Sequence, residues 1–257
     1  MCNKDLVSII TPTYNCARFI EETIRSVQAQ TYANWEMIIS DDCSTDNTRE
    51  VIVPYLDSDK RIKYICNKRN SGAAVTRNNA LKVAQGRWIA FLDSDDLWLP
   101  AKLERQVAFM EQNGYSFSYH EYMEISEDGN NLNIYVSGIK RVRRFGMYAC
   151  CWPGCLSVMY DASKIGLIQI NDVKKNNDTA MWLKVIKKAD CYLLKENLAK
   201  YRRRKGSITP PSIKDRILWH YRLFREAEQM SKVKSVLWMC INIVGNLYKK
   251  LFYVHNI

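Results

Sequence analysis

The stretch VSIITPTYN, residues 7–15, is a short apolar run that ends in aromatic and polar residues. A continuous apolar run without alternating polar residues is typical of a strand buried on both faces of a parallel sheet. We expect this strand to stop at Pro12. Residues 17–30 follow as a helix, because large apolar side chains recur there at the spacing of one helical face. These side chains are Phe19, Ile20, Ile24 and Val27.

The same alternation of strand and helix recurs along the first half of the chain. Further strands are predicted at residues 35–40, 62–66 and 87–92, and helices at 46–55, 72–85 and 100–113. Buried strands separated by helices of about 10 to 15 residues predict an α/β fold with a mostly parallel, doubly wound sheet and flanking helices. After Tyr115 the pattern loosens, and residues 178–188 indicate one more amphipathic helix before a helical C-terminal tail.

Composition narrows the class of protein. The chain has 257 residues, of which 47% are hydrophobic and 25% charged, which excludes disordered, collagen-like and coiled-coil proteins. No run reaches the roughly 18 apolar residues that cross a bilayer. The nine cysteines are an odd number in a large chain without a leader-like start, so we expect reduced thiols in the cytoplasm. Cys150, Cys151 and Cys155 have no nearby histidine, and a zinc site is not expected.

The positive charge is concentrated at one end of the chain. Residues 1–199 hold 25 basic and 24 acidic side chains, whereas residues 200–257 hold 13 basic and 3 acidic ones, a net charge of +10. A nucleic-acid binder with its contacts spread over the whole fold is therefore not expected. We place the boundary at Pro210-Pro211, with a catalytic unit at 1–209 and a basic tail at 210–257. Within the catalytic unit, the nucleotide-binding part is expected at about 1–113 and the acceptor part at about 114–209.

The tail combines basic and aromatic residues at helical spacing. This combination suits a helix that lies in an anionic membrane surface. The alternative is that the tail packs its apolar face against the body or against a second subunit in a homodimer.

Three predicted strands end in side chains that can bind a nucleotide diphosphate. In an open parallel sheet, ligands bind beyond the carboxyl ends of the strands. The first strand ends in Pro12, Thr13 and Tyr14, which offer an aromatic face for a base. The second ends in Asp41 and Asp42, whose carboxylates can accept hydrogen bonds from a base or a ribose. The acidic turn that follows also predicts a local cap for the next helix, with Ser44 as the N-cap and Asp46 in the first turn.

The fourth predicted strand ends in Asp93, Ser94 and Asp95. Two carboxylates with one residue between them can both reach a hard divalent cation, which would neutralise a diphosphate. An Asp-x-Asp pair is also a common turn or helix cap. The conjunction of three such segments at the ends of parallel strands is what points to a nucleotide diphosphate site.

Four segments together resemble the family 2 glycosyltransferases with the glycosyltransferase-A fold: residues 7–15, 40–46, 70–78 and 91–98. The resemblance implies a metal-dependent, inverting transfer of a sugar from a nucleotide-sugar donor, a UDP-sugar by that likeness, with Mn²⁺ or Mg²⁺ as the cofactor. It implies a saccharide acceptor, lipid-linked, in the synthesis of bacterial surface polysaccharides. The expected location is the cytoplasm, with the basic tail placing the enzyme at the inner face of the cell membrane if the tail binds lipid.

The resemblance also assigns roles to individual residues. It places Pro12, Thr13 and Tyr14 around the uracil and ribose, and Asp42 on the uracil ring with Asp41 beside it. Further implied contacts are Arg77 near the nucleotide or its phosphates, Asp93 with Ser94 on the ribose and sugar side, and Asp95 on the metal with Asp93 beside it. Asp96 is either a further sugar contact or a cap for the helix after Pro100.

The reaction also needs a general base, because an acceptor hydroxyl is a poor nucleophile until its proton is removed. The segment NDTAMWL, residues 177–183, resembles the family segment in which an aspartate that opens a helix is this base, and Asp178 is the predicted residue. The alternative is that Asp178 only caps its helix. Asp172 is the next candidate.

Two weaker likenesses concern the acceptor side and the phosphates. Residues 154–157 resemble the loop that borders the acceptor, and Trp152 is either an acceptor platform or part of the core. Residues 201–207 resemble a stretch in which a histidine often stands at the position of Arg204. Arginine does not ligate a metal, but it can pair with phosphate oxygens.

Other functions remain as alternatives. A sugar-nucleotide nucleotidyltransferase usually has a glycine-rich loop after its first strand, where this chain has residues 12–15. A non-catalytic nucleotide-sugar-binding module would share the same site. A Rossmann dehydrogenase is disfavoured because no G-x-G-x-x-G follows a predicted strand.

Overall fold

The computed structural model describes residues 3–171, 173, 175–204 and 213–256. Its strands are β1 (Asn3–Thr13), β2 (Trp35–Asp41), β3 (Ile62–Cys66), β4 (Gly86–Phe91), β5 (Leu97–Trp98), β6 (Phe117–Ile125), β7 (Asn131–Val136), β8 (Arg141–Val142), β9 (Met159–Asp161), β10 (Cys191–Arg202) and β11 (Val254–Asn256). Its helices are α1 (Ile20–Gln28), α2 (Thr48–Ser58), α3 (Ala73–Val83), α4 (Lys102–Asn113), α5 (Arg144–Ala149), α6 (Ala162–Ile165), α7 (Asn177–Val185), α8 (Ile213–Arg222) and α9 (Lys232–Phe252). A 3₁₀ turn spans Cys155–Ser157 and a π-helical segment spans Leu223–Ala227.

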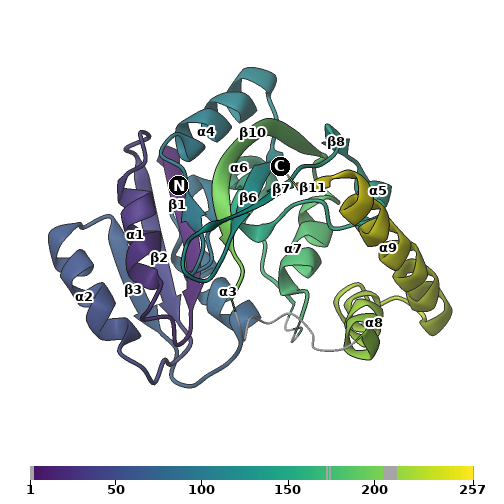
Figure 1. Ribbon diagram of the computed structural model, residues 1–257, viewed down its shortest axis with the longest axis horizontal. Coiled ribbons are helices and arrows are strands. Elements are labelled where there is room, and N and C mark those ends of the chain that lie inside the picture. The colour runs from purple at the N-terminus through teal and green to yellow at the C-terminus, as the bar shows by residue number, and fades with distance from the viewer. Residues whose placement is uncertain (1–2, 172, 174, 205–212, 257) are drawn as a thin grey trace.

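One mixed sheet forms the centre of the molecule. Strands β3, β2, β1 and β4 run parallel to one another in this spatial order, with Val7 beside Trp35 and Trp88. Beyond β4 the antiparallel strand β9 separates β4 from β6, and β7 and β11 continue the sheet. Strand β10 pairs parallel to β6 (Figure 1). The parallel, doubly wound first half is therefore confirmed, and the second half adds antiparallel strands.

Helices cover both faces of the sheet. One apolar core joins alternate residues of β1 and β2, such as Ile9 and Met37, to α1, α2 and α4. A second core joins the intervening residues, such as Ile10 and Ile38, to α3, α5 and α7. Because successive side chains of a strand point to opposite faces, the continuous apolar runs read from the sequence supply both cores.

Two local predictions were wrong. Strand β1 does not stop at Pro12 but continues to Thr13, whose carbonyl accepts the backbone N–H of Asp42 at 2.9 Å. Proline lacks only its own backbone N–H group, so the strand can continue through Pro12 at this position. Helix α2 begins at Thr48, and Ser44 is not its N-cap. Asp46 instead accepts the backbone N–H of Thr48 at 3.1 Å.

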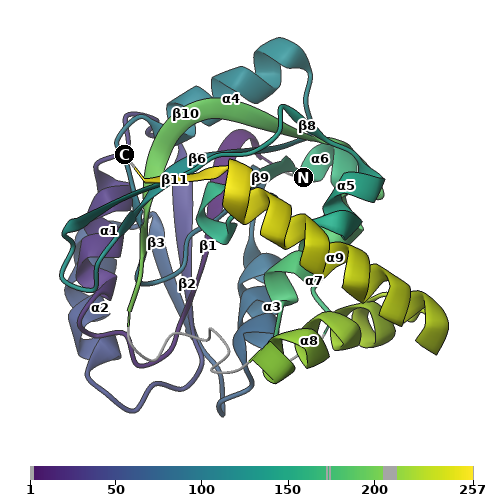
Figure 2. The ribbon, with the colours of Figure 1, turned by 45° about the vertical axis from the view of Figure 1, so that its right-hand side comes forward.

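The C-terminal segment packs back onto the body. Helix α9 crosses the side of the molecule beside α5 and α8 (Figure 2), and β11 adds a strand to β7. That last strand was not predicted, and the expected boundary at Pro210-Pro211 lies outside the described residues. Within the described part of the chain, no helix is both long and apolar enough to cross a membrane.

Candidate active site

The loops that follow β1 and β2 are fastened to each other at the carboxyl edge of the sheet. Thr13 lies beside Asp41 in the parallel register. The backbone N–H of Asn15 donates to the hydroxyl of Ser44 at 2.9 Å, and the N–H of Thr45 donates to the side chain of Asn15 at 2.8 Å. Asn15 has a φ of 46°, a left-handed conformation that asparagine tolerates well. These contacts hold the Pro12–Tyr14 segment against the acidic turn.

Asp41 is buried and holds the loop around it. One carboxylate oxygen accepts the N–H and the hydroxyl of Ser44 at 2.9 and 2.7 Å, and the other accepts the hydroxyl of Tyr64 at 2.7 Å. Burial and this hydrogen bond raise the pKa of Tyr64. Asp41 thus fixes the geometry of the turn in which Asp42 stands.

Asp42 joins the second strand to the start of α3. Its carboxylate accepts the side-chain amide of Asn67 at 2.8 Å and the backbone N–H groups of Ser71 and Gly72 at 2.7 Å each. Gly72 has a φ of 87°, which other residues rarely adopt, so a glycine suits this close turn. Asn67 is a contributor that the sequence did not single out, since it follows β3 without a motif of its own.

The aromatic residue at this edge is open to solvent. Tyr14 is 45% exposed, Pro12 is half-buried and Thr13 is buried. The hydroxyl of Thr13 has no hydrogen-bond partner among the described residues. The exposed ring of Tyr14 is therefore free to stack on a planar base.

Arg77 links two predicted parts of the site. It lies on α3, is buried, and donates to Asp93 at 2.5 Å and to the side chain of Asn177. Burial disfavours its charge, but the neighbouring charges of Asp93, Cys155 and Asp178 outweigh this effect and raise the pKa of Arg77. The guanidinium fork thereby ties the turn after β4 to the first turn of α7.

Asp178 lies in that first turn of α7 and is half-buried. One of its oxygens accepts the backbone N–H of Thr179 at 2.7 Å, while the N-cap residue is Asn176. The charge of Asp178 also acts on Cys155, whose pKa is raised well above its usual value by burial first and by Asp93 next. Asp93, Arg77, Asp178 and Cys155 therefore form one electrostatic cluster, although α3, α7 and the turn after β4 are far apart in sequence.

Arg204 faces Asp95. Its Nε lies 2.7 Å from a carboxylate oxygen of Asp95, an ion pair by distance, although the N–H is not aimed at that oxygen. Burial and the charge of Asp93 raise the pKa of Asp95, while Arg204 opposes this rise. Two carboxylates are thus held close together, with Arg204 as the adjacent positive charge.

Asp96 has a role that neither sequence alternative described. It is buried, and its carboxylate accepts the backbone N–H of Arg202 at 2.8 Å. The side chain of Arg202 donates to the carbonyl of Asp95 at 2.8 Å and to Glu22 at 2.6 Å. Helix α4 has Ala101 at its N-cap, so Asp96 does not cap it. Asp96 and Arg202 instead lock the end of β10 onto the turn that carries Asp93 and Asp95.

The remaining predicted residues border this cluster. Ser94 is buried, and its carbonyl accepts the thiol of Cys16 at 3.3 Å. Trp152 is buried with its ring edge-on to Tyr253 at 5.0 Å between centroids, as its core alternative predicts. Gly154 lies so close to Tyr122 that an added Cβ would stand 2.8 Å from that ring.

The donor atoms at Asp93 and Asp95 fit a hard divalent cation. Two carboxylates that repel each other in a half-buried turn gain from a cation placed between them. Within the described residues there is no group of three or more His, Cys, Asp or Glu side chains that could hold a metal alone. The remaining ligands of such a cation would therefore come from phosphate oxygens and water, in keeping with a metal bound together with a diphosphate.

A parallel sheet half with an exposed aromatic ring, acidic turns and a buried arginine at its carboxyl edge is an arrangement typical of nucleotide-binding enzymes of the transferase class. Residues 8–155 match the model of the family described as glycosyl transferase family 2, and the chain belongs to this family. The fold is the glycosyltransferase-A fold. The resemblance seen in the sequence is thereby confirmed.

Two relatives match along most of their length. The chain is 40% identical over 249 residues to TuaG of Bacillus subtilis (strain 168), a glycosyltransferase named for teichuronic acid biosynthesis, covering 96% of this chain and 98% of TuaG. It is 39% identical over 212 residues to WfgD of Escherichia coli, covering 82% of each. WfgD is named as a UDP-Glc:alpha-D-GlcNAc-diphosphoundecaprenol beta-1,3-glucosyltransferase.

Solved structures share the fold at low sequence identity. TarS of S. aureus, residues 1–349 in complex with UDP-GlcNAc, superposes with a TM-score of 0.72 at 20% identity, covering 96% of this chain and 73% of TarS. The mannosyltransferase PcManGT of Pyrobaculum calidifontis, in complex with GDP-Man and Mn²⁺, gives a TM-score of 0.63 at 18% identity, covering 91% and 68%.

Proposed function

We propose that this enzyme transfers a sugar from a UDP-sugar to a lipid-linked saccharide, with inversion at the anomeric carbon, during the synthesis of a cell-surface polysaccharide. The observation that carries the proposal is Arg77, which joins Asp93 to the first turn of α7, where Asp178 stands. This contact brings the donor side and the candidate base into one site. The names of TuaG and WfgD support the polysaccharide and the diphosphoundecaprenol-linked acceptor.

The donor is proposed to lie along the carboxyl edge of β1, β2 and β4. Tyr14 stacks on the uracil, with Pro12 and Thr13 beside it, and Asp42 with Asp41 shapes the pocket that receives the ring N–H. Arg204 pairs with phosphate oxygens once the diphosphate is bound, because its guanidinium already lies at this edge. Asp93 and Ser94 face the ribose and sugar.

Asp93 and Asp95 would hold the Mn²⁺ or Mg²⁺ ion. When bound, such a cation supplies positive charge that stabilises the departing diphosphate. We place the reaction on the cytoplasmic side of the cell membrane, the compartment expected from the odd number of nine cysteines in a large chain.

Asp178 is proposed to act as the general base. The acceptor hydroxyl attacks the anomeric carbon as the bond to the diphosphate breaks, and its proton passes to the carboxylate of Asp178. Arg77 positions this helix and holds Asp93 in place. One base on one side of the sugar and a leaving diphosphate on the other side give inversion.

The test replaces Asp178 with asparagine, which keeps the size of the side chain and can still accept the Thr179 N–H. We expect sugar transfer to fall by about 10² to 10⁴-fold, with UDP binding and melting temperature nearly unchanged. Asp190→Asn is the matched control, since Asp190 pairs with Arg141 at the surface.

Retained transfer in Asp178→Asn would move the base elsewhere, with Asp172 the next residue to test. Release of UDP distinguishes transfer from a nucleotidyltransferase, which would release pyrophosphate. A binding module would show UDP-sugar binding with no turnover in the wild type.

A further inference from the structure

Helix α9 presents small and polar residues to the body of the protein. Ser235 and Asn242 are buried, and the amide of Asn242 donates to the carbonyl of Tyr148 at 2.9 Å. At Gly245 an added Cβ would stand 2.0 Å from the carbonyl oxygen of Ala149. The amine of Lys249 donates to the carbonyl of Trp152 at 2.6 Å. Trp238 and Met239 are the main apolar side chains on this inner side.

The opposite side of α9 is apolar and exposed. Its large apolar side chains have exposed fractions from 38% to 81%. We call this surface the outer face of α9, and its residues are Val233, Val236, Leu237, Ile243, Val244, Leu247, Tyr248, Leu251 and Phe252. Their spacing of three, four and seven residues places them on one side of the helix. This arrangement is the reverse of an ordinary surface helix, which turns its apolar side inward.

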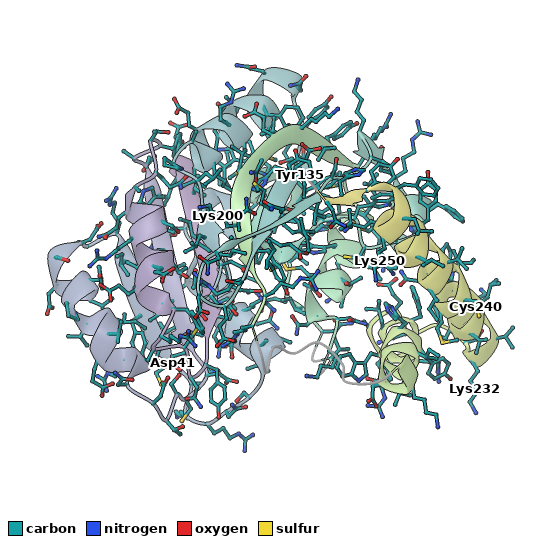
Figure 3. All side chains as sticks on the ribbon, in the orientation of Figure 1. Asp41, Tyr135, Lys200, Lys232, Cys240 and Lys250 are labelled. Atoms are coloured by element: carbon teal, nitrogen blue, oxygen red, sulfur yellow. The ribbon has the colours of Figure 1, made fainter. Side chains whose placement is uncertain are left out.

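Lysines border the outer face on both sides. Lys232 and Lys250 are 18 residues apart, five helical turns, so they lie on the same edge. Lys234 lies about 200° around the helix from Lys232, on the other edge. All three are exposed, and Figure 3 labels Lys232, Cys240 and Lys250 along α9. Residues 232–256 contain four lysines and no Asp or Glu.

A neighbouring segment places another exposed aromatic ring beside α9. Phe145 on α5 is 66% exposed, and its ring lies 5.4 Å from that of Trp238 on α9. Arg143 and Arg144, both exposed, precede it. An exposed aromatic ring beside two arginines repeats the pattern of α9, an apolar surface with basic residues at its border.

We propose that the outer face of α9, together with Phe145, is a docking surface for the anionic headgroup region of a lipid bilayer. The apolar side chains enter the boundary between headgroups and acyl chains, while the bordering lysines meet the lipid phosphates. A second copy of this chain fits less well, because an isologous contact would place the same lysines against each other with no carboxylate between them. The helix therefore lies in the plane of the surface and does not cross the bilayer.

Docking at this face would also orient the candidate active site. Lys249 contacts the carbonyls of Cys151 and Trp152, and this loop continues to Cys155, which lies in the electrostatic cluster with Arg77 and Asp178. The bilayer would thus be coupled to the loop that borders the site. This consequence rests on the proposed function, whereas lipid binding itself does not.

The test is flotation of the full chain with vesicles of phosphatidylglycerol and phosphatidylcholine, or of phosphatidylcholine alone. The variant Leu237→Glu/Val244→Glu/Leu251→Glu places carboxylates on the outer face, and Val53→Glu/Val83→Glu/Leu167→Glu is a control at three exposed apolar sites elsewhere. We expect wild type and control to float with the anionic vesicles and the α9 variant to float about tenfold less. Lys232→Gln/Lys234→Gln/Lys250→Gln should remove the preference for anionic over neutral vesicles.

Melting temperature and UDP binding, measured on the same preparations, show whether each variant is folded and separate this proposal from the proposed function. Wild type that stays unbound, or an α9 variant that floats as well as wild type, would overturn the proposal. A dimer in sedimentation equilibrium that dissociates in the α9 variant, with no flotation of the wild type, would assign the face to a second copy instead.

Discussion

Arg77 is the residue on which the candidate site depends most. A buried guanidinium can donate to Asp93 and to Asn177 at the same time because its fork holds several N–H groups in fixed directions. Asp93, Asn177 and Asp178 come from segments that the sequence keeps apart by more than 80 positions. One side chain therefore links the turn after β4 to the first turn of α7, where the proposed base stands.

Arg77→Lys tests this positioning role. Lysine keeps the charge but cannot bridge both partners, so we expect kcat to fall by about 10²-fold, with a smaller change in the KM for the donor. The readout is steady-state transfer together with the melting temperature. Arg105→Lys is the control, since Arg105 pairs with Glu196 on the surface. Equal kcat in Arg77→Lys and Arg105→Lys would show that the bridge does not position the site.

We expect Arg204 and a divalent cation to compete for Asp95. Arg204→Gln removes the positive charge that now neutralises this carboxylate. We expect the affinity for Mn²⁺ to rise by about fivefold or more in calorimetry, while UDP binding in the presence of EDTA becomes weaker. Arg203→Gln, whose side chain pairs with Glu124, is the control. Unchanged Mn²⁺ affinity would place the cation away from Asp95.

At the scale of single elements, α4 carries an unusual buried lysine. Lys102 is fully buried, its amine has no hydrogen-bond partner among the described residues, and it lies 3.7 Å from the centroid of the Trp98 ring. Burial lowers the pKa of Lys102 well below its usual value. The folded protein therefore holds this amine neutral at a pH where the unfolded chain protonates it.

This difference predicts how the stability of the protein depends on pH. Between the lowered pKa of Lys102 in the folded protein and the ordinary lysine pKa, the unfolded chain binds one more proton than the folded chain, so Lys102 makes the free energy of unfolding rise with pH, by up to about 1.4 kcal/mol per pH unit. Lys102→Met should remove this slope and raise the melting temperature at pH values below the ordinary lysine pKa. Lys82→Met, at an exposed site, is the control. An unchanged slope in Lys102→Met would contradict the buried neutral amine.

The strands and helices of the first half were predictable because each one has a hydrophobic periodicity within its own sequence. Strand β3 lies at 62–66 as predicted, and the helices begin or end within a few residues of their expected bounds. Strand β10 was missed because its sequence, CYLLKENLAKYR, mixes charged and apolar residues in a strand that is partly exposed. Its position depends on pairing with β6 and on the contact of Arg202 with Asp96. Both are contacts between residues far apart in the sequence, so a local sequence pattern does not predict them.

For the whole molecule, the strand ends predicted which side chains lie together at the carboxyl edge of the sheet, but not the contacts among them. Asp42, Asp93 and Asp95 were proposed as site residues from motifs at the ends of β2 and β4. The links among them involve Asn67 and Arg202, which are buried through tertiary packing and have no motif. The basic tail likewise followed from charge counts, whereas the orientation of α9, with its polar side inward, required the structure.

The most direct test of the central claim is the configuration of the sugar released from the donor. A screen by calorimetry first selects the UDP-sugar that binds best in the presence of Mn²⁺, and proton NMR then follows its slow hydrolysis, in which water replaces the acceptor. We predict that an α-linked donor releases the β-sugar first, before mutarotation, together with UDP, and that Asp178→Asn abolishes this release. First appearance of the α-sugar, or equal hydrolysis by Asp178→Asn, would contradict an inverting transferase with Asp178 as its base.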